Sequence, residues 1–128
     1  MSDKFKVEII TPNETILKTE TNEVNIPSFE GQMGILKDHI PLITFLRPGI
    51  ISLQDQEKKY YVEEGTVEFS NNNLLILTST AKDLKELNQN SIEDILNKAE
   101  KKLSDNNSSD KEKYLLSYKI NTLKEISQ

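Results

Sequence analysis

The chain has 128 residues, of which 35% are hydrophobic and 29% are charged, and its mean hydropathy is −0.56. This length and composition suffice for one core and exclude a large multidomain enzyme. No apolar run approaches the about 18 residues that a membrane-spanning helix needs, and the first residues lack the apolar segment of a signal peptide.

The charged residues and the absence of cysteine limit which kinds of functional site this chain can form. Without cysteine, disulfides, thiolate catalysis and cysteine-bound zinc or iron–sulfur centres are impossible. Sixteen basic residues stand against 21 acidic residues, which gives a net charge of −5, and Arg47 is the only arginine. Because arginine is the side chain best suited to phosphate and base recognition, we expect no nucleic-acid partner.

Residues 1–84 are predicted to form an all-β antiparallel sandwich. Apolar residues recur at every second position, as in Phe5, Val7 and Ile9, which is typical of half-buried strands. All four glycines and all four prolines lie within the first 65 residues, so turn signals separate the strands. The other expected strands are 15–19, 24–26, 42–46, 50–54, 59–63, 67–69 and 74–77.

Two turns and one unusual strand stand out in this part of the chain. Asparagine tolerates the left-handed backbone of tight turns, so residues 71–73 are expected to join 67–69 and 74–77 into a hairpin. Residues 11–14 are expected to form another turn. The run 74–77 is continuously apolar, and we interpret it as a strand buried on both faces.

Residues 85–128 are predicted to form a connector and an antiparallel hairpin of two helices. Ser91 is the expected N-cap of the first helix, and Ser109 with Glu112 predicts a capping box for the second. Residues 81–90 are polar and lack glycine and proline, and we interpret them as a connector that lets the hairpin move. The apolar residues at helical spacing are Ile92, Ile95, Leu96, Ala99, Leu103, Leu115, Leu116, Ile120, Leu123 and Ile126.

The turn-rich residues 28–42 are the one segment with a possible catalytic group. His39 as a general base, oriented by Asp38 or Glu30, would make a hydrolase-like site. Neighbours on a strand point to opposite faces, so Asp38 cannot readily orient His39, and a loop histidine is the preferred interpretation. One histidine and scattered carboxylates give no metal-ligand spacing. We expect no catalytic group and no metal site, and we assign turn roles to Gly31, Gly34, Pro41, Pro48 and Gly49.

The pattern Glu30-Gly31-x-x-Gly34-Ile35-Leu36-x-x-His39-x-Pro41-Leu42, followed by Leu46-x-Pro48-Gly49, closely resembles the epsilon subunit of bacterial F-type ATP synthases, the counterpart of the mitochondrial delta subunit. The strand-rich front and the two-helix tail agree with this family over essentially the whole chain. The resemblance implies a non-catalytic rotor subunit whose sandwich binds the gamma subunit and rests on the ring of c subunits. It also implies a peripheral position at the cytoplasmic face of the bacterial plasma membrane.

The same resemblance implies roles for particular residues. The c-ring contact candidates are Glu30, Gln32, Lys37, Asp38 and His39. The C-terminal helices can extend into the alpha/beta catalytic head and restrain ATP hydrolysis in relatives, and the candidates here are Ile92, Ile95, Leu96, Lys111, Lys113, Lys119 and Lys124. Some relatives bind ATP through an arginine in the first helix, but residues 92–99 contain none, so no cofactor is expected.

Two alternatives stay open. The lysines of the second helix alternate with acidic residues, which favours a solvated face, and contact with an acidic partner surface is the other interpretation. For the whole chain, the competing hypothesis is a free-standing β-sandwich adaptor whose helical hairpin docks an unrelated protein.

Overall fold

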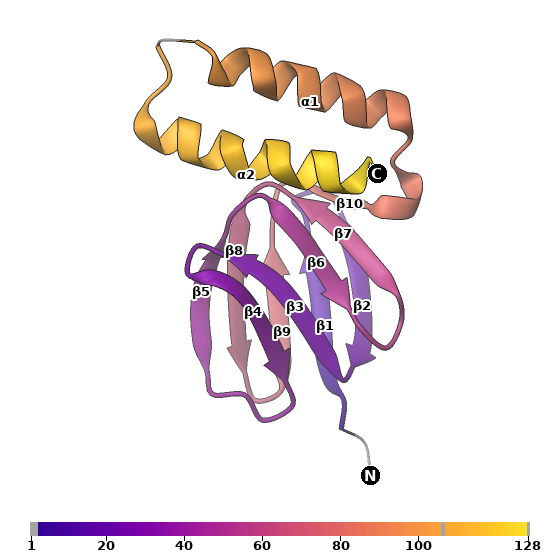
Figure 1. The fold of residues 1–128 in the computed structure, drawn as a ribbon. Helices are drawn as coiled ribbons and strands as arrows, with labels where there is room; N and C mark the ends of the chain where they lie inside the picture. The colour runs from indigo at the N-terminus through magenta and orange to yellow at the C-terminus, as the bar shows by residue number, and fades with distance from the viewer. Residues whose placement is uncertain (1–2, 106, 128) are drawn as a thin grey trace.

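The computed structural model describes residues 3–105 and 107–127. The chain folds into a two-layer β-sandwich, and a hairpin of two helices lies across one end of it (Figure 1). The strands are β1 (Phe5–Ile10), β2 (Thr15–Thr21), β3 (Glu23–Ser28), β4 (Gly31–Leu36), β5 (Leu42–Leu46), β6 (Gly49–Leu53), β7 (Lys58–Val62), β8 (Gly65–Ser70), β9 (Asn73–Leu77) and β10 (Ala81–Asp83). A 3-10 turn, η1 (Leu84–Glu86), leads to α1 (Gln89–Leu103) and α2 (Asp110–Ile126). The predicted sandwich followed by two helices is confirmed.

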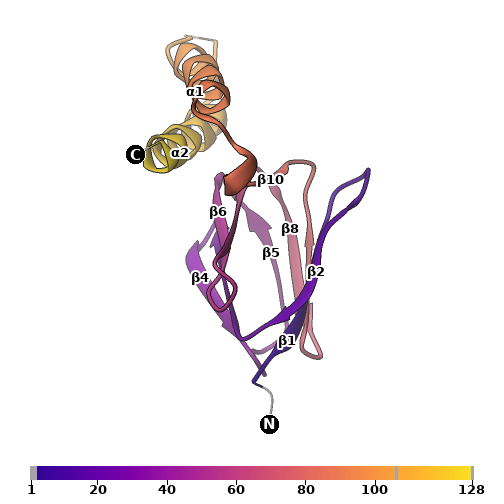
Figure 2. The same cartoon turned by 90° about the vertical axis from the view of Figure 1, so that its right-hand side faces the viewer.

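The two layers join at β3. One layer has the order β10-β7-β6-β3-β4, and the other has the order β5-β8-β9-β1-β2. Ser28 of β3 pairs with Leu46 of β5, which connects the layers. All pairs are antiparallel except β1 with β9, which is parallel. Figure 2 shows the two layers from the side, with the hairpin beyond the ends of β6 and β10.

The core lies between the layers. Inward residues such as Val7, Ile9, Val24 and Ile76 are fully buried, and their outward neighbours along each strand are polar or partly exposed. This is the arrangement that the two-residue periodicity predicts for strands with one covered face.

The turn between β8 and β9 is the predicted one. Asn71 and Asn72 have φ angles of 52° and 59°, and Ser70 pairs with Asn73. Positive φ at both central residues is the geometry that matches the twist of a two-residue hairpin. Asp38 also has a positive φ of 66°, and its backbone N–H donates to Asn72 Oδ1 at 2.7 Å, which ties two turns together at this end.

The segment between Glu30 and His39 is a strand where a loop was expected. β4 pairs with β3 in register from Gly31 opposite Ser28 to Leu36 opposite Glu23, so most of this segment forms the second arm of a hairpin. Gly31, with φ of 124°, does serve the turn. The turn role assigned to Gly34 is wrong, because Gly34 lies in the middle of β4, where an added Cβ would approach Asn25 Oδ1 to 3.1 Å.

The run 74–77 is not buried on both faces. Leu74 and Ile76 are buried, whereas Leu75 is partly exposed and Leu77 is 45% exposed. The expectation is wrong because no second layer covers the outer side of β9.

The start of the first helix also differs from the prediction. Asn88, not Ser91, is the N-cap, and its Oδ1 accepts a hydrogen bond from the Ser91 backbone N–H at 2.8 Å. Asparagine caps as well as serine, and the earlier cap adds a turn. Ser109 caps α2 as expected, accepting from the Glu112 backbone N–H at 3.1 Å.

The connector between the two parts is ordered structure. Residues 81–83 form β10 on the edge of β7, and residues 84–86 form η1. Leu84 and Leu87 pack against a buried cluster of Tyr61, Ile92 and Leu123, where the sandwich meets both helices. The connector is therefore not wholly polar, because its two leucines contribute to this cluster, and its role in letting the hairpin move stays a prediction.

Candidate functional site

The contacts of His39 do not form a catalytic arrangement. Its Nδ1 lies 2.7 Å from the carbonyl oxygen of Ile40, and its ring meets Phe69 edge-to-face at 5.9 Å. The Asp38 carboxylate accepts from Asn72 Nδ2 at 3.0 Å, and Glu30 lies at the opposite end of β4. Within residues 3–105 and 107–127, no group of three or more metal-binding side chains is placed to hold an ion.

The outer face of the β5-β8-β9-β1 layer is the most apolar exposed surface. The strand register places Phe45, Thr66, Leu77 and Ile10 in one row across four neighbouring strands. The next row is Ile43, Glu68, Leu75 and Glu8, so apolar and acidic side chains alternate there. Ile43, Phe45 and Leu77 are 71%, 60% and 45% exposed. We call Ile10, Ile43, Phe45, Leu75 and Leu77 the apolar face. Contiguous exposed apolar side chains on a sheet mark an interaction surface.

A groove of about 790 Å³ continues the apolar face toward the helices. Its lining includes Ile10, Phe45 and Leu77 of the sheet, Phe29 after β3 and Leu115 of α2. Lys111 and Glu64 add charged groups to its wall. The groove therefore joins the sheet face and the first turns of α2 into one concave surface.

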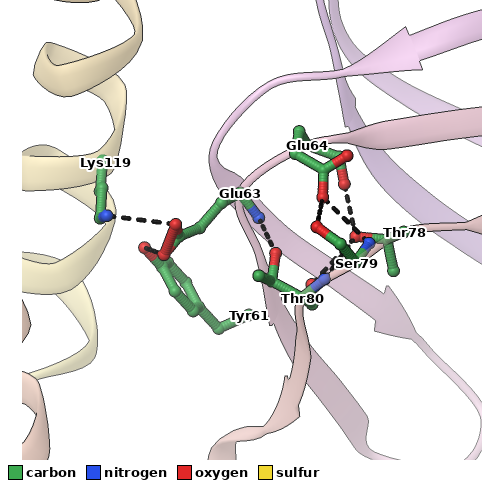
Figure 3. A network of polar contacts seen from close by, with 7 residues as sticks. All are labelled: Tyr61, Glu63, Glu64, Thr78, Ser79, Thr80 and Lys119. Atoms are coloured by element: carbon green, nitrogen blue, oxygen red, sulfur yellow. Dashed lines mark hydrogen bonds and ion pairs between the residues drawn. The ribbon is translucent and has the colours of Figure 1, made fainter. Parts of the chain in front are cut away.

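Polar contacts fix the turn between β7 and β8 beside this groove (Figure 3). Glu64 accepts hydrogen bonds from both the backbone N–H and the hydroxyl of Ser79, and the Glu63 N–H donates to Thr80 Oγ1 at 3.2 Å. The Glu63 carboxylate accepts from the Tyr61 hydroxyl at 3.2 Å and pairs with Lys119 Nζ at 3.1 Å. One turn is thus tied both to the segment between β9 and β10 and to α2.

Burial and the neighbouring Glu63 carboxylate both raise the pKa of Tyr61. Its ring is buried under the helices, and its pKa is raised above the ordinary value of 10.0, first by burial and then by the charge of Glu63. Both effects keep the phenol neutral and able to donate.

Two aromatic contacts and the ion pair hold α2 on the sandwich. The Phe29 and Tyr114 rings are stacked with centroids 6.2 Å apart. The Arg47 guanidinium lies 4.0 Å from the centroid of the Tyr118 ring, a cation–π geometry. Figure 1 shows α2 lying against the sandwich end, with α1 on its far side.

The candidate regulatory residues fall into two groups. Ile92 is buried, and Ile95 and Leu96 pack against the same cluster, so these three hold the hairpin together and onto the sandwich. Lys119 pairs with Glu63, so the solvated-face interpretation is wrong for this lysine. The lysines with exposed side chains are Lys111, Lys113 and Lys124.

The five c-ring candidates do not lie together. Glu30 and Gln32 lie at the end of β4 that adjoins the helices, and Lys37, Asp38 and His39 follow its other end. Four residues of strand, 33–36, at about 3.3 Å each separate the two groups. Pro48 is buried in the turn before β6, and Gly49 is the buried first residue of β6, where an added Cβ would lie 2.5 Å from Pro27 Cβ. Pro41 is exposed before β5.

Sequence reasoning missed the apolar face. The signal was present in β5, where Ile43 and Phe45 point to one face of the strand and Leu42 and Leu46 point to the other. A strand with apolar side chains on both faces is expected to be buried on both faces, and here the core buries only one of them. The contacts of Phe29, Tyr114 and Tyr118 had no comparable sequence signal.

The fold is a β-sandwich with large exposed apolar side chains on one outer face and a two-helix hairpin at its end. Residues 4–83 match the sequence family described as the ATP synthase Delta/Epsilon chain, beta-sandwich domain. An "ATP synthase epsilon chain" from Pelagibacter ubique (strain HTCC1062) is 45% identical over 130 residues, covering 99% of this chain and 100% of that protein.

Two further comparisons agree. An "ATP synthase subunit delta, mitochondrial" from Schizosaccharomyces pombe is 35% identical over 114 residues, covering 85% of this chain and 66% of that protein. A chain in the structure of the Euglena gracilis mitochondrial ATP synthase (OSCP/F1/c-ring) superposes with a TM-score of 0.82 and 19% identity, covering 100% of this chain and 84% of that chain. The chain belongs to the ATP synthase delta/epsilon family.

Proposed function

We propose that this chain is a central-stalk subunit of an F-type ATP synthase, where it joins the gamma subunit to the ring of c subunits without performing catalysis itself. Family membership over nearly the whole length supports the complex, and the uncovered apolar face supports a binding role. In such a complex the chain is peripheral to the membrane at the cytoplasmic face. Neither described helix has the length and apolarity to span a bilayer.

The apolar face is the proposed contact with gamma, and it is the observation on which the function most depends. Phe45 and Ile43 stand on a strand whose other face is locked in the core, so they form a rigid projection. Burying a large apolar side chain contributes about 1.5–3 kcal/mol, and aromatic anchors near the centre of an interface dominate its energy. A rigid β layer gripping a partner in this way can transmit torque.

Affinity for purified gamma tests this contact. Phe45→Asp places an unpaired charge in the interface, so we expect the binding free energy to weaken by at least about 2 kcal/mol, which raises the Kd for gamma roughly 30-fold. Lys59→Asp on β7 of the other layer is the control, and its affinity should stay within about twofold. Unchanged binding by Phe45→Asp, with the sandwich folded, would contradict the assignment.

The proposed ring contact is the end of the sandwich that carries Glu30 and Gln32. Both side chains are exposed there. At the other end Asp38 is bound to Asn72 and His39 packs on Phe69, so those polar groups already have internal contacts. Glu30→Lys should reduce ATP-driven proton pumping by the assembled complex, and Lys37→Glu should not. The reverse result would place the ring at the far end.

The docked hairpin supports a second role, restraint of ATP hydrolysis. Partly exposed contacts of Tyr114, Tyr118 and Lys119 hold α2 on the sandwich, and each is weak. The buried cluster of Leu123 with Tyr61 adds to them, so opening has to separate that cluster as well. An opened hairpin would be free to reach the alpha/beta catalytic head. Deleting residues 91–128 should raise the ATPase activity of the assembled head, and unchanged activity would retire this role.

A further inference from the structure

β4 ends its layer with an unpaired edge. It pairs with β3 on one side, and Figure 2 shows it at the margin of its layer. Edge strands expose a row of unpaired N–H and C=O groups, and proteins normally protect such edges with charges, proline or short length. β4 has six residues, Gly-Gln-Met-Gly-Ile-Leu, and none is charged or proline.

The other free edges in the described part of the chain are protected. β2 includes Lys18 and Glu20, and β10 has only three residues, one of them Lys82. β5 is also uncharged, but its last residues bond to the β3 end, where the Phe29 N–H donates to the Phe45 carbonyl at 3.0 Å. The lack of protection is therefore concentrated at β4.

The register of β3 and β4 identifies the unpaired groups. Pro27 lies opposite Gln32 and has no N–H, and its carbonyl accepts from the Arg47 N–H at 3.0 Å on the opposite side. Bonded and non-bonded pairs alternate along an antiparallel ladder, so the bonds to β3 pass through alternate residues of β4. Those are Gly31, Met33 and Ile35, which leaves the backbone groups of Gln32 and Gly34 and the N–H of Leu36 facing the free edge. The Leu36 carbonyl already accepts from the His39 N–H at 3.1 Å.

Exposed apolar side chains connect this edge to the apolar face. Leu36 at the end of β4 is 55% exposed and Ile40 in the following loop is 74% exposed, and Ile43 and Phe45 continue the series along the chain. Lys37 and Asp38 interrupt this series in one exposed turn, where the Asp38 carboxylate is bonded to Asn72, so a partner that covers the apolar face reaches the β4 edge past a single charged turn.

We propose that an extended segment of the gamma subunit adds a strand to the free edge of β4. This inference rests on the proposed function, because it takes gamma as the occupant of the adjoining apolar face. Only an extended backbone satisfies N–H and C=O groups at every second residue of a strand, which is the chemistry of β-strand addition. An apolar side chain in that segment would cover Leu36.

Amide hydrogen exchange of the full chain, alone and with purified gamma, tests the pairing. The Gln32, Gly34 and Leu36 amides should exchange freely in the chain alone and at least tenfold more slowly in the complex, whereas the Met33 and Ile35 amides should be protected in both. Free exchange at all three positions within a formed complex would overturn the proposal. Protection that depends on the concentration of this chain without gamma would also overturn it, in favour of self-association.

A matched pair of variants isolates one backbone bond. Gly34→Ala and Gly34→Pro add the same Cβ near Asn25, but only proline removes the N–H that faces the free edge. Gly34→Pro should bind gamma about tenfold more weakly than Gly34→Ala, and equal affinities would count against the strand. If Gly34→Pro does not fold, the exchange experiment still decides. Failure of the unmodified chain to bind gamma would refute the proposed function instead.

Discussion

Truncation of Leu123 should release the helical hairpin and leave the sandwich folded. Leu123 is fully buried, in a cluster with Tyr61 of the sandwich and Ile92 of α1. Removing a buried leucine side chain costs about 2–5 kcal/mol, because apolar contacts are lost and a cavity remains. The ion pair and the aromatic contacts of α2 each contribute only about 0.2–1.5 kcal/mol. Leu123→Ala therefore removes as much stabilisation as these contacts provide together.

Amide hydrogen exchange measures the effect directly. A loss of 2 kcal/mol or more raises the opening equilibrium of α2 at least about 30-fold, so exchange in α2 should accelerate by that factor. Exchange in β8 and β9 should stay as slow as in the unmodified chain. Leu115→Ala, on the partly exposed side of the same helix, is the control and should change exchange by less than about tenfold. Equal acceleration in the strands and in α2 would refute the separability of hairpin and sandwich.

Three further predictions concern stability. Glu63→Gln removes the ion pair with Lys119 and should lower the free energy of unfolding by about 1 kcal/mol or less in urea titrations, with a smaller loss in 1 M salt; a loss independent of salt would contradict the pair's contribution. The pKa of Tyr61 is raised in the folded chain, so above about pH 10 the unfolded chain ionises this phenol first and stability falls by up to about 1.4 kcal/mol per pH unit. Below pH 10 the neutral Tyr61 contributes its full stabilisation. Above pH 10 the free energy of unfolding of Tyr61→Phe should fall less steeply with pH than that of the unmodified chain, and equal slopes would contradict a raised Tyr61 pKa. Gly49→Ala forces a Cβ against Pro27 and should cost about 1–3 kcal/mol, which an unchanged Tm would disprove.

Local patterns predicted most of the fold because they report which face of an element is covered. The alternation at Phe5, Val7 and Ile9 and the helical spacing in residues 110–126 each describe a single buried face, and both elements are found. β4 was missed because Gly31 and Gly34 are turn-forming residues, and nothing local to them shows that β3 lies alongside.

The surfaces were harder to predict because they depend on pairing between distant segments. Phe45 and Leu77 become neighbours only through the register of β8, which lies between their strands. Likewise, Glu30 and Lys37 are close in sequence, yet a strand holds them at opposite ends of the layer. One contiguous motif in the sequence is therefore divided between two surfaces in the fold.

Site-specific photocrosslinking in the assembled complex tests the central claim most directly. A photoreactive phenylalanine in place of Phe45 should form a covalent product with gamma, and the same group in place of Lys59, on the outer side of the other layer, should not. Capture of gamma from position 45 alone is the predicted result. Efficient capture from position 59 with none from position 45 would contradict the assignment of the apolar face.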